Sequence, residues 1–176
     1  MARQLWLLRH AEAEPHGTRP DPDRRLTRRG EQQARAAGVA IQRMAVAFDE
    51  VLFSPKVRAR MTAELAAEGW SARQRELLRE HPPLAGGFDA WRAIDALAGV
   101  SPEDGRLLLV GHEPDLSLTV GGLTGGRIDL KKGGLAVVRL EGVAPRLGDD
   151  GVVGELAILM RPRELALIAG VPIERD

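Results

Sequence analysis

The stretch Leu107-Leu108-Leu109-Val110, followed directly by Gly111-His112, decides the fold class of this chain. Consecutive apolar residues without polar alternation are typical of a central strand that is covered on both faces. The change to glycine and histidine marks the carboxyl end of that strand. We therefore expect a mainly parallel sheet with helices on both sides.

Other short apolar segments alternate with helical patterns, which is the sequence pattern of an α/β layer fold. Strands are expected at residues 5–8, 51–53, 74–77, 107–110, 135–140 and 156–160. Helices are expected after Thr27, after Ser54-Pro55, and at residues 88–98, 114–123 and 164–168. The predicted architecture is a three-layer sandwich, with a mainly parallel central sheet flanked by helices.

Local signals predict where the helices begin and which side chains they bury. Thr27 and Ser54 are expected N-caps, with Pro55 at the first helical position and Arg58 in the first turn. Helical spacing directs Trp91, Ile94 and Leu97 toward the core. The Pro- and Gly-containing residues 145–154 predict a hairpin-like loop between the last two strands.

Composition bounds the class of protein. The chain has 176 residues with 25 Lys+Arg and 25 Asp+Glu, so its net charge is zero and its length fits one domain, residues 1–176. With 44% hydrophobic and 28% charged residues it can bury a core, which excludes a disordered tail protein. The balanced charge gives no overall field for nucleic acid or a membrane surface. The absence of Cys excludes disulfides and cysteine nucleophiles.

We expect no targeting signal at the start of this sequence. Only four apolar residues, at positions 5–8, precede Arg9, which is too few for a signal peptide. No later uncharged stretch approaches the ~20 residues of a membrane span. We expect a soluble cytoplasmic protein. The sequence defines no oligomeric state.

Polar residues fall at the ends of two predicted strands. Arg9-His10 follows the first strand and Gly111-His112 follows the fourth. Ligands of doubly wound sheets bind outside the carboxyl ends of strands, so both histidines are expected to face one crevice. Arg58, at a predicted helix N-terminus, adds a guanidinium group for an anion. Together these residues predict a pocket for a phosphoryl group.

A single His or Arg at a strand end is more often structural than catalytic, and only the joint placement favours a site. His16 and His81 lie in loops without a motif and are interpreted as surface residues. Asp21-Pro22-Asp23 has the spacing of an aspartyl-phosphate motif, but no hydrophobic strand precedes it. Arg24, Arg25, Arg28 and Arg29 form a basic run that is usually a solvated helix start, although part of it can border the pocket.

The chemistry available to such a pocket is narrow. There is no P-loop, no Gly-x-Ser-x-Gly elbow and no His-Glu-x-x-His pair, and no metal motif. The remaining nucleophile is a neutral imidazole, for which His10 is the natural choice. Arg9 and Arg58 would hold the phosphoryl oxygens and His112 would donate to them. This mechanism requires no metal or other cofactor.

Four ordered segments carry a family resemblance. They are residues 8–14 (Leu-Arg-His-Ala-Glu-Ala-Glu), 26–30 (Leu-Thr-Arg-Arg-Gly), 54–63 (from Ser-Pro-Lys-Val-Arg to Met-Thr-Ala) and 110–114 (Val-Gly-His-Glu-Pro). Residues 130–133 and 154–156 add to the likeness, which runs nearly end to end. In these segments the chain resembles the histidine phosphatase superfamily, and within it the small SixA-type phosphohistidine phosphatases.

The resemblance implies a phosphoglycerate mutase-like α/β sandwich in which His10 forms a transient phosphohistidine. It also implies that Arg9 and Arg58 bind phosphate, that His112 completes the pocket, and that Arg24 reaches the site. The family's usual proline after that arginine is Arg25 here. The implied activity is that of a phosphatase in signalling or phosphotransfer.

The general acid used by larger members of the superfamily lacks a recognisable motif here. The corresponding segment offers only Glu80, and Glu113 and Asp115, which lie close to His112 in the sequence, are the alternatives. An alkoxide leaving group needs a proton, whereas a phosphohistidine nitrogen is protonated readily near pH 7. We therefore favour phosphohistidine in a partner protein as the substrate. The alternatives are small phosphorylated metabolites and a non-catalytic phosphate-binding module.

Overall fold

The computed structural model describes residues 2–140 and 153–172. The predicted loop at residues 145–154 lies outside these ranges except for its last two residues. The strands are β1 (Arg3–Arg9), β2 (Glu50–Phe53), β3 (Leu78–Glu80), β4 (Arg106–Gly111), β5 (Leu135–Leu140) and β6 (Gly154–Met160). The α-helices are α1 (Arg28–Arg43), α2 (Val57–Ala67), α3 (Ala72–Arg75), α4 (Ala90–Ala96), α5 (Asp115–Thr124) and α6 (Pro162–Ala169), and short 3-10 turns are η1 (Asp21–Asp23), η2 (Pro82–Ala85) and η3 (Leu97–Gly99).

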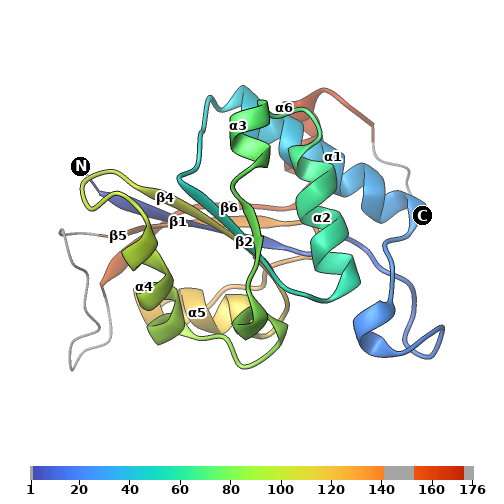
Figure 1. Cartoon of the computed structure of the whole chain (residues 1–176), viewed down its shortest axis with the longest axis horizontal. Helices are drawn as coiled ribbons and strands as arrows, with labels where there is room; N and C mark the ends of the chain where they lie inside the picture. Colours follow the sequence, from blue (N-terminus) through green and yellow to red (C-terminus); the bar gives the residue numbers. More distant parts are fainter. Residues whose placement is uncertain (1, 141–152, 173–176) are drawn as a thin grey trace.

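The six strands form one sheet in the order β3-β2-β4-β1-β5-β6. Figure 1 labels β1, β2, β4, β5 and β6 of this sheet. Neighbours are parallel from β3 through β2 and β4 to β1, whereas β5 is antiparallel to both β1 and β6. The decisive run at residues 107–110 forms most of β4, and each of its side chains is at most 1% exposed. The prediction of a mainly parallel sheet with a covered central strand is confirmed.

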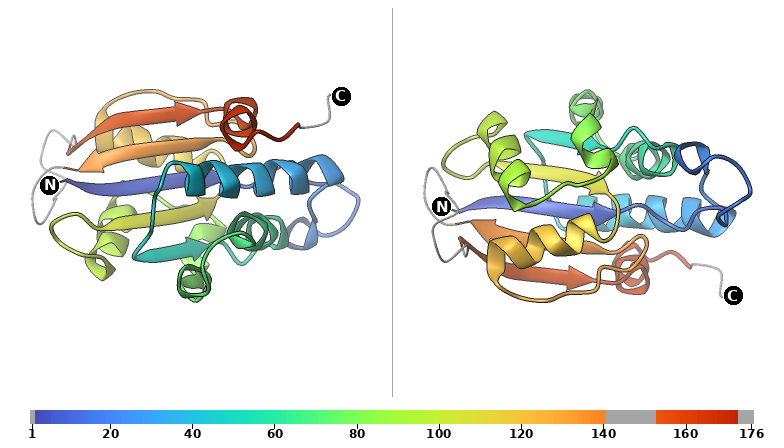
Figure 2. Two further views of the ribbon diagram at one scale, coloured as in Figure 1. Left: turned by 90° about the horizontal axis from the view of Figure 1, so that it is seen from above. Right: turned by 90° about the horizontal axis from the view of Figure 1, so that it is seen from below.

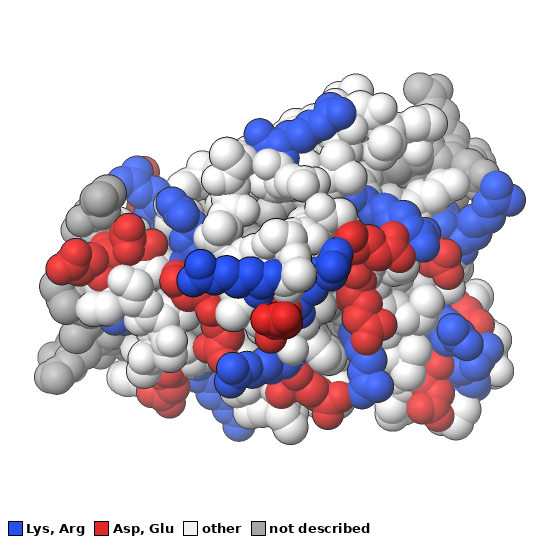
Figure 3. Space-filling view, turned by 45° about the horizontal axis from the view of Figure 1, so that its top comes forward, with Lys and Arg blue, Asp and Glu red and all other residues white. Residues whose placement is uncertain are grey.

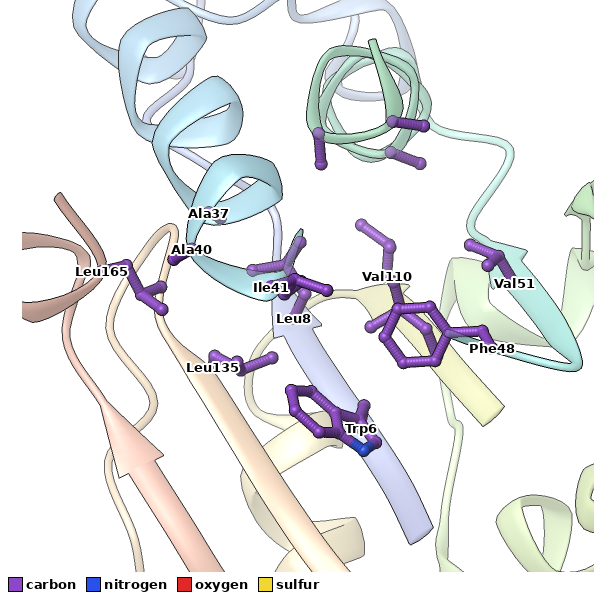
Figure 4. Packing of buried hydrophobic residues seen from close by; sticks show 14 of the residues in the cluster. Trp6, Leu8, Ala37, Ala40, Ile41, Phe48, Val51, Val110, Leu135 and Leu165 are labelled. Carbon is purple, nitrogen blue, oxygen red and sulfur yellow. The ribbon is translucent and has the colours of Figure 1, made fainter. Parts of the chain in front are cut away.

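Helices cover both faces of the sheet, which gives three layers (Figure 2). The period of a strand sends alternate side chains to opposite faces. Trp6, Leu8 and Val110 accordingly pack with Ile41 of α1 and Leu165 of α6 (Figure 4). Leu5, Leu7 and Leu109 pack on the other face, with residues of α4 and α5. The predicted sandwich is thus built on two apolar clusters.

Acidic and basic side chains are intermingled over the face shown in Figure 3. An ion pair between Arg35 of α1 and Glu68, which follows α2, with Nε and Oε2 2.9 Å apart, is one such contact. Within the described residues, no helix is both long and apolar enough to cross a bilayer.

The strand predicted at residues 74–77 is wrong. That segment contains the end of α3 and a turn, and the strand β3 starts at Leu78. Ser71 caps α3 by accepting a hydrogen bond from the Gln74 backbone N–H. The Gln74 side chain bonds to both the N–H and the carbonyl of Phe48. A local cap and a side-chain contact therefore override the apolar-strand pattern.

Trp91 was expected to face the core, and this prediction is wrong because the side chain is 61% exposed. Asp89 caps α4 by accepting from the Arg92 N–H, and the residues buried behind that cap are Ala90 and Ala93. A Cβ on Gly122 of α5 would lie 2.8 Å from the Cβ of Ala90. The close approach of α4 and α5 selects small residues at the contact and leaves the indole outside.

The start of α2 also differs from the prediction. The helix begins at Val57, with Lys56 as its N-cap and no side-chain cap. Pro55 therefore precedes the helix. The Ser54 hydroxyl contacts the His112 ring instead of capping the helix. Arg58 still lies in the first turn of α2, as the sequence indicated.

Candidate active site

The carboxyl ends of three neighbouring strands converge on one pocket. His10 follows β1, His112 follows β4 and Ser54 follows β2, while Arg58 enters from the first turn of α2. The centroids of the two imidazole rings are 5.2 Å apart. His10, His112 and Arg58 are 6%, 7% and 4% exposed. Residues 48 to 102 positions apart in the chain are thus brought into one buried cluster, where the sequence predicted a shared crevice.

The ring of His10 is fixed by the backbone. Its Nδ1 lies 2.8 Å from the carbonyl oxygen of Ala11. A carbonyl only accepts, so Nδ1 carries the hydrogen and Nε2 keeps a lone pair. Burial is the main reason that the pKa of His10 lies well below its usual value, and the nearby His112, Arg58 and Arg9 lower it further. The structure therefore holds a neutral imidazole whose Nε2 can act as a nucleophile.

Arg58 contacts that lone pair. Its Nε lies 3.3 Å from Nε2 of His10. Its two terminal nitrogens donate to Asp21, from Nη1 to the carbonyl oxygen at 2.7 Å and from Nη2 to Oδ2 at 3.3 Å. A guanidinium group placed this way can stabilise negative charge on a phosphoryl group at His10.

The ring of His112 is held by the hydroxyl of Ser54. Its Nε2 lies 2.7 Å from the Ser54 hydroxyl oxygen, and that serine is fully buried. Among the described residues, Nδ1 of His112 has no hydrogen-bond partner. Burial, with the charges of Arg58 and Lys56, lowers the pKa of His112 to about 3. The ring is neutral at pH 7, and an orphaned buried nitrogen is what a ligand atom would satisfy.

Arg9 closes another side of the pocket. Its Nη1 donates to the carbonyl of Leu130 at 2.9 Å, and its Nε lacks a partner among the described residues.

The backbone of Gly133 supports the chain at the end of β1. The N–H of Gly133 donates to the carbonyls of Arg9 and His10, at 3.2 and 3.1 Å. Gly133 has φ of +70°, a conformation that favours glycine. This accounts for the glycine after Lys131-Lys132.

The glycine of the Leu-Thr-Arg-Arg-Gly segment serves the same region. Thr27 caps α1 as predicted, because its side chain accepts from the N–H of Gly30. A Cβ on Gly30 would lie 1.9 Å from the carbonyl oxygen of Glu12. The N–H of Thr27 donates to that same carbonyl at 3.1 Å. Gly30 therefore lets α1 approach the chain that leaves His10.

The loop between β1 and α1 contributes Arg24, as the resemblance implied, and also Asp21, which was not predicted to be a site residue. Arg24 is buried and donates from Nη1 to the carbonyl of Glu14 at 2.7 Å. Asp21, whose motif had been set aside, binds Arg24, Arg58 and Lys56. The sequence signal for Asp21 is that it stands three residues before Arg24, because a single 3-10 turn brings these two side chains together. Nothing in the sequence indicated Lys56.

These side chains line a pocket of about 320 Å³. Its walls are formed by Arg9, His10, Ala13, Glu14, Pro15, His16, Asp21, Arg24, Arg58, His112, Glu113 and Lys132. The predicted residues Arg9, His10, Arg24, Arg58, His112 and Glu113 are thus brought together. His16 is exposed, as expected, but it also lines this pocket. His81 is half-buried against Phe88 and lies outside it.

The predicted acids Glu80 and Glu113 are placed differently, whereas Asp115 accepts from the N–H of Phe88 at 3.0 Å and is not part of the pocket wall. Glu113 lies in the pocket wall and accepts from the Ser117 N–H at 3.2 Å. Burial raises its pKa, against the lowering effects of Ser117 and Arg9. Glu80 ends β3, is exposed and pairs with Arg60, and it is not part of the pocket wall. Of the three, only Glu113 is placed to give a proton to a bound group.

The charges of the pocket suit a phosphate. Among the described residues, no group of three or more His, Asp or Glu side chains is arranged to hold a metal ion. Four cations, Arg9, Arg24, Arg58 and Lys132, outnumber the three carboxyl groups of Glu14, Asp21 and Glu113 in the pocket wall, and the two neutral imidazoles of His10 and His112 face the same space. Such a set can bind a phosphoryl group and accept it on Nε2 of His10.

Comparisons with known proteins identify what this chain is similar to. A model of the histidine phosphatase superfamily (branch 1) matches residues 5–83. An uncharacterized protein of Picosynechococcus sp. is 31% identical over 169 residues, which cover 92% of this chain and 98% of that protein.

Solved structures share the fold. The protein histidine phosphatase SixA, complexed with tungstate, has a TM-score of 0.73 at 23% identity, covering 92% of this chain and 99% of its own. A protein from Nakamurella multipartitia, proposed to be a SixA phosphohistidine phosphatase, has the same TM-score of 0.73 at 27% identity, with 92% and 97% covered. The alpha-ribazole phosphatase of Shigella flexneri follows with a TM-score of 0.65 at 21% identity, with 90% and 96% covered. The chain belongs to the histidine phosphatase superfamily.

Proposed function

We propose that this chain is a phosphatase that carries the phosphoryl group on His10 and acts on phosphohistidine in a signalling or phosphotransfer protein. The observation that carries the proposal is the contact of Arg58 Nε with Nε2 of a neutral, buried His10. The hydrogen bond of Nδ1 to the Ala11 carbonyl leaves the lone pair on Nε2. Arg58 donates to that lone pair, so the cation that would stabilise the transferred charge is already in place when a phosphoryl group takes its position at Nε2.

The proposed reaction has two steps. Nε2 of His10 attacks phosphorus, the bond from phosphorus to the substrate nitrogen breaks, and the substrate ring leaves as neutral imidazole because it is protonated near pH 7. Water then attacks phospho-His10, its oxygen and protons leave with the phosphate, and the neutral ring returns. Arg9, Arg24 and Arg58 hold the phosphoryl oxygens, and Nδ1 of His112 donates to one of them.

Two considerations support phosphohistidine as the substrate. The first is that its leaving group is a ring nitrogen, which needs no strong acid. The fold is also similar to that of SixA, named as a protein histidine phosphatase. The proposed compartment is the cytoplasm, which fractionation of the source cells tests.

A second candidate substrate class is small phosphomonoesters. Glu113 favours it, because a buried carboxyl with a raised pKa can protonate an alkoxide leaving group. The similar fold of an alpha-ribazole phosphatase is consistent with this alternative. In that case the two steps at His10 are unchanged and Glu113 supplies the proton to the leaving oxygen.

The test is phosphate release in the presence of EDTA from a phosphohistidine-bearing protein and from a panel of phosphomonoesters. His10→Ala should lower turnover at least about 10³-fold while the chain stays folded. His81→Ala is the matched control, because His81 lies outside the pocket wall. Mass spectrometry after rapid quenching in alkali should find the phosphoryl group on His10.

Preference for phosphohistidine, lost in His10→Ala, supports the proposal. Preference for an ester reassigns the substrate to the second class. If neither substrate type is turned over while inorganic phosphate still binds, the proposal that the chain is an enzyme is wrong, and a phosphate-binding module is favoured. Full activity of His10→Ala contradicts the mechanism for either substrate.

A further inference from the structure

One carboxylate ties together three cationic side chains at the pocket. Oδ1 of Asp21 accepts from Arg24, from Nε at 3.0 Å and from Nη2 at 2.8 Å. Oδ2 accepts from Nη2 of Arg58 and lies 3.3 Å from Nζ of Lys56. The backbone carbonyl of Asp21 accepts a further bond from Nη1 of Arg58 at 2.7 Å. Asp21 therefore holds Arg58 by two of its atoms and Arg24 by a third.

The shape of a guanidinium group shows what these contacts leave free. Its five N–H bonds lie in one plane, and the two terminal nitrogens form one edge while Nε and one terminal nitrogen form another. Asp21 takes the edge of Arg58 that joins Nη1 and Nη2. The neighbouring edge points toward His10, because Nε lies 3.3 Å from Nε2 of that ring. This second edge is where the oxygens of a phosphoryl group on His10 would be.

We propose that Asp21 is a positioning residue, which holds Arg58 by one edge so that the other edge faces the phosphoryl group during its transfer to and from His10. The inference rests on the proposed function of His10. Arg58 is an α2 residue and Asp21 lies in the loop after β1, so this contact also couples that loop to the helix. Asp21 acts through Arg58 and does not itself touch the phosphoryl group.

A purely electrostatic role for Asp21 predicts the opposite result. Removing a negative charge from a pocket that binds an anion should strengthen phosphate binding and raise kcat/KM. Loss of positioning should instead lower kcat, because a displacement of a catalytic group by about 1 Å can cost 10²-fold in rate. The sign of the change in Asp21→Asn therefore separates the two roles.

The experiment compares wild type with Asp21→Asn, Asp21→Glu and the control Asp23→Asn. Asp23 lies in the same η1 turn, is exposed and is not part of the pocket wall. Two probes are titrated calorimetrically into each folded variant: inorganic phosphate, which resembles the bound product, and orthovanadate, which adopts the five-coordinate geometry of phosphoryl transfer. Circular dichroism and thermal melting check that each variant is folded.

For Asp21→Asn we expect kcat to fall about 10- to 100-fold and vanadate to bind about tenfold or more weakly, with phosphate affinity unchanged or higher. Asp21→Glu keeps the charge but moves the carboxylate, so it should not restore kcat. Asp23→Asn should match wild type. Unchanged or raised kcat in Asp21→Asn, or wild-type vanadate binding, overturns the proposal.

The vanadate titrations of wild type and of Asp21→Asn test this proposal independently of which substrate the chain uses. If wild type turns over neither phosphohistidine nor esters, the proposed function fails, yet the weakening of vanadate relative to phosphate still tests Asp21. If turnover is normal and vanadate binds equally in wild type and Asp21→Asn, only the positioning role fails.

Discussion

The hydroxyl oxygen of Ser54 lies 2.7 Å from Nε2 of His112, and both side chains are buried. The same hydroxyl oxygen accepts from the N–H of Lys56 at 3.3 Å. The hydroxyl hydrogen is free to point to the ring nitrogen, which lies at hydrogen-bond distance. We infer that Ser54 donates to Nε2, so that the neutral ring of His112 carries its hydrogen on Nδ1 and donates from there into the pocket.

Removal of the Ser54 hydroxyl should weaken catalysis without preventing binding. Ser54→Ala leaves Nε2 of His112 free to take the hydrogen, which turns Nδ1 into an acceptor that repels a phosphoryl oxygen. A lost hydrogen bond of about 1–2 kcal/mol corresponds to a five- to thirtyfold fall in kcat, with a smaller change in KM. Steady-state kinetics measure the fall.

Nitrogen-15 chemical shifts of the His112 ring report the tautomer directly. They should show the hydrogen on Nδ1 in wild type and on Nε2 in Ser54→Ala. Wild-type kinetics together with an unchanged tautomer would show that Ser54 only fills space.

Glu113 should matter for one substrate class and not for the other. Glu113→Gln keeps the size of the side chain but cannot donate the carboxyl proton. Turnover of phosphomonoesters with alkoxide leaving groups should fall about 10²-fold, whereas turnover of phosphohistidine should change less than threefold. Glu80→Gln is the control, because Glu80 is exposed and bound to Arg60. Equal losses on both substrates would mean that Glu113 has another role, such as holding Arg9.

Strand ends and motif residues were predictable because they depend on local patterns. The apolar run of β4 and the histidines after β1 and β4 follow from strand periodicity and from the geometry of parallel sheets. Thr27 was predictable as a cap because capping involves residues three positions apart. For such features the physical cause lies within a few residues of the chain.

The failures came from contacts between distant segments. Trp91 faces outward because Gly122 and Ala90 bring α5 and α4 close together, which no pattern within residues 88–98 records. The residues around Ser54 predict that it caps a helix, but its hydroxyl contacts the ring of His112, which is 58 positions away. Asp21 was set aside only as an aspartyl-phosphate nucleophile, and its contact with Arg58, 37 positions away, has no local signal. The parts of the site set by long-range hydrogen bonds were the ones that the sequence could not supply.

Acid should destabilise the fold through His112. Its pKa is about 3 in the folded chain, mainly through burial, against about 6.5 when unfolded. Between these values the unfolded chain binds more protons than the folded chain, so stability is lost as the pH falls from 6.5 toward 3. From pH 7 to pH 5, one such histidine lowers the free energy of unfolding by about 2 kcal/mol.

Urea unfolding at pH 7 and pH 5 measures this loss. His112→Gln removes the titrating group and should show a loss smaller by about 2 kcal/mol over the same range. His10 remains in both chains, and because burial is the main cause of its lowered pKa, most of its own contribution cancels in the comparison. The same pH dependence in wild type and variant would show that His112 is not buried in its neutral form.

The contact of α1 with α2 gives a test of the packing that positions Arg58. Helix propensity alone predicts that Gly38→Ala, within α1, stabilises the chain by about 1 kcal/mol. A Cβ at this position, however, would lie 1.8 Å from the carbonyl oxygen of Ala66 in α2, which only a backbone shift can relieve. For Gly38→Ala we expect the free energy of unfolding to fall by about 2 kcal/mol and the Tm by about 4–8 °C.

The control is Gly86→Ala, because a Cβ at that position meets nothing within 4 Å. The free energy of unfolding of this variant should stay within about 0.5 kcal/mol of wild type. Differential scanning calorimetry measures both, and a stabilised Gly38→Ala would mean that the helices are not packed backbone to backbone at this point.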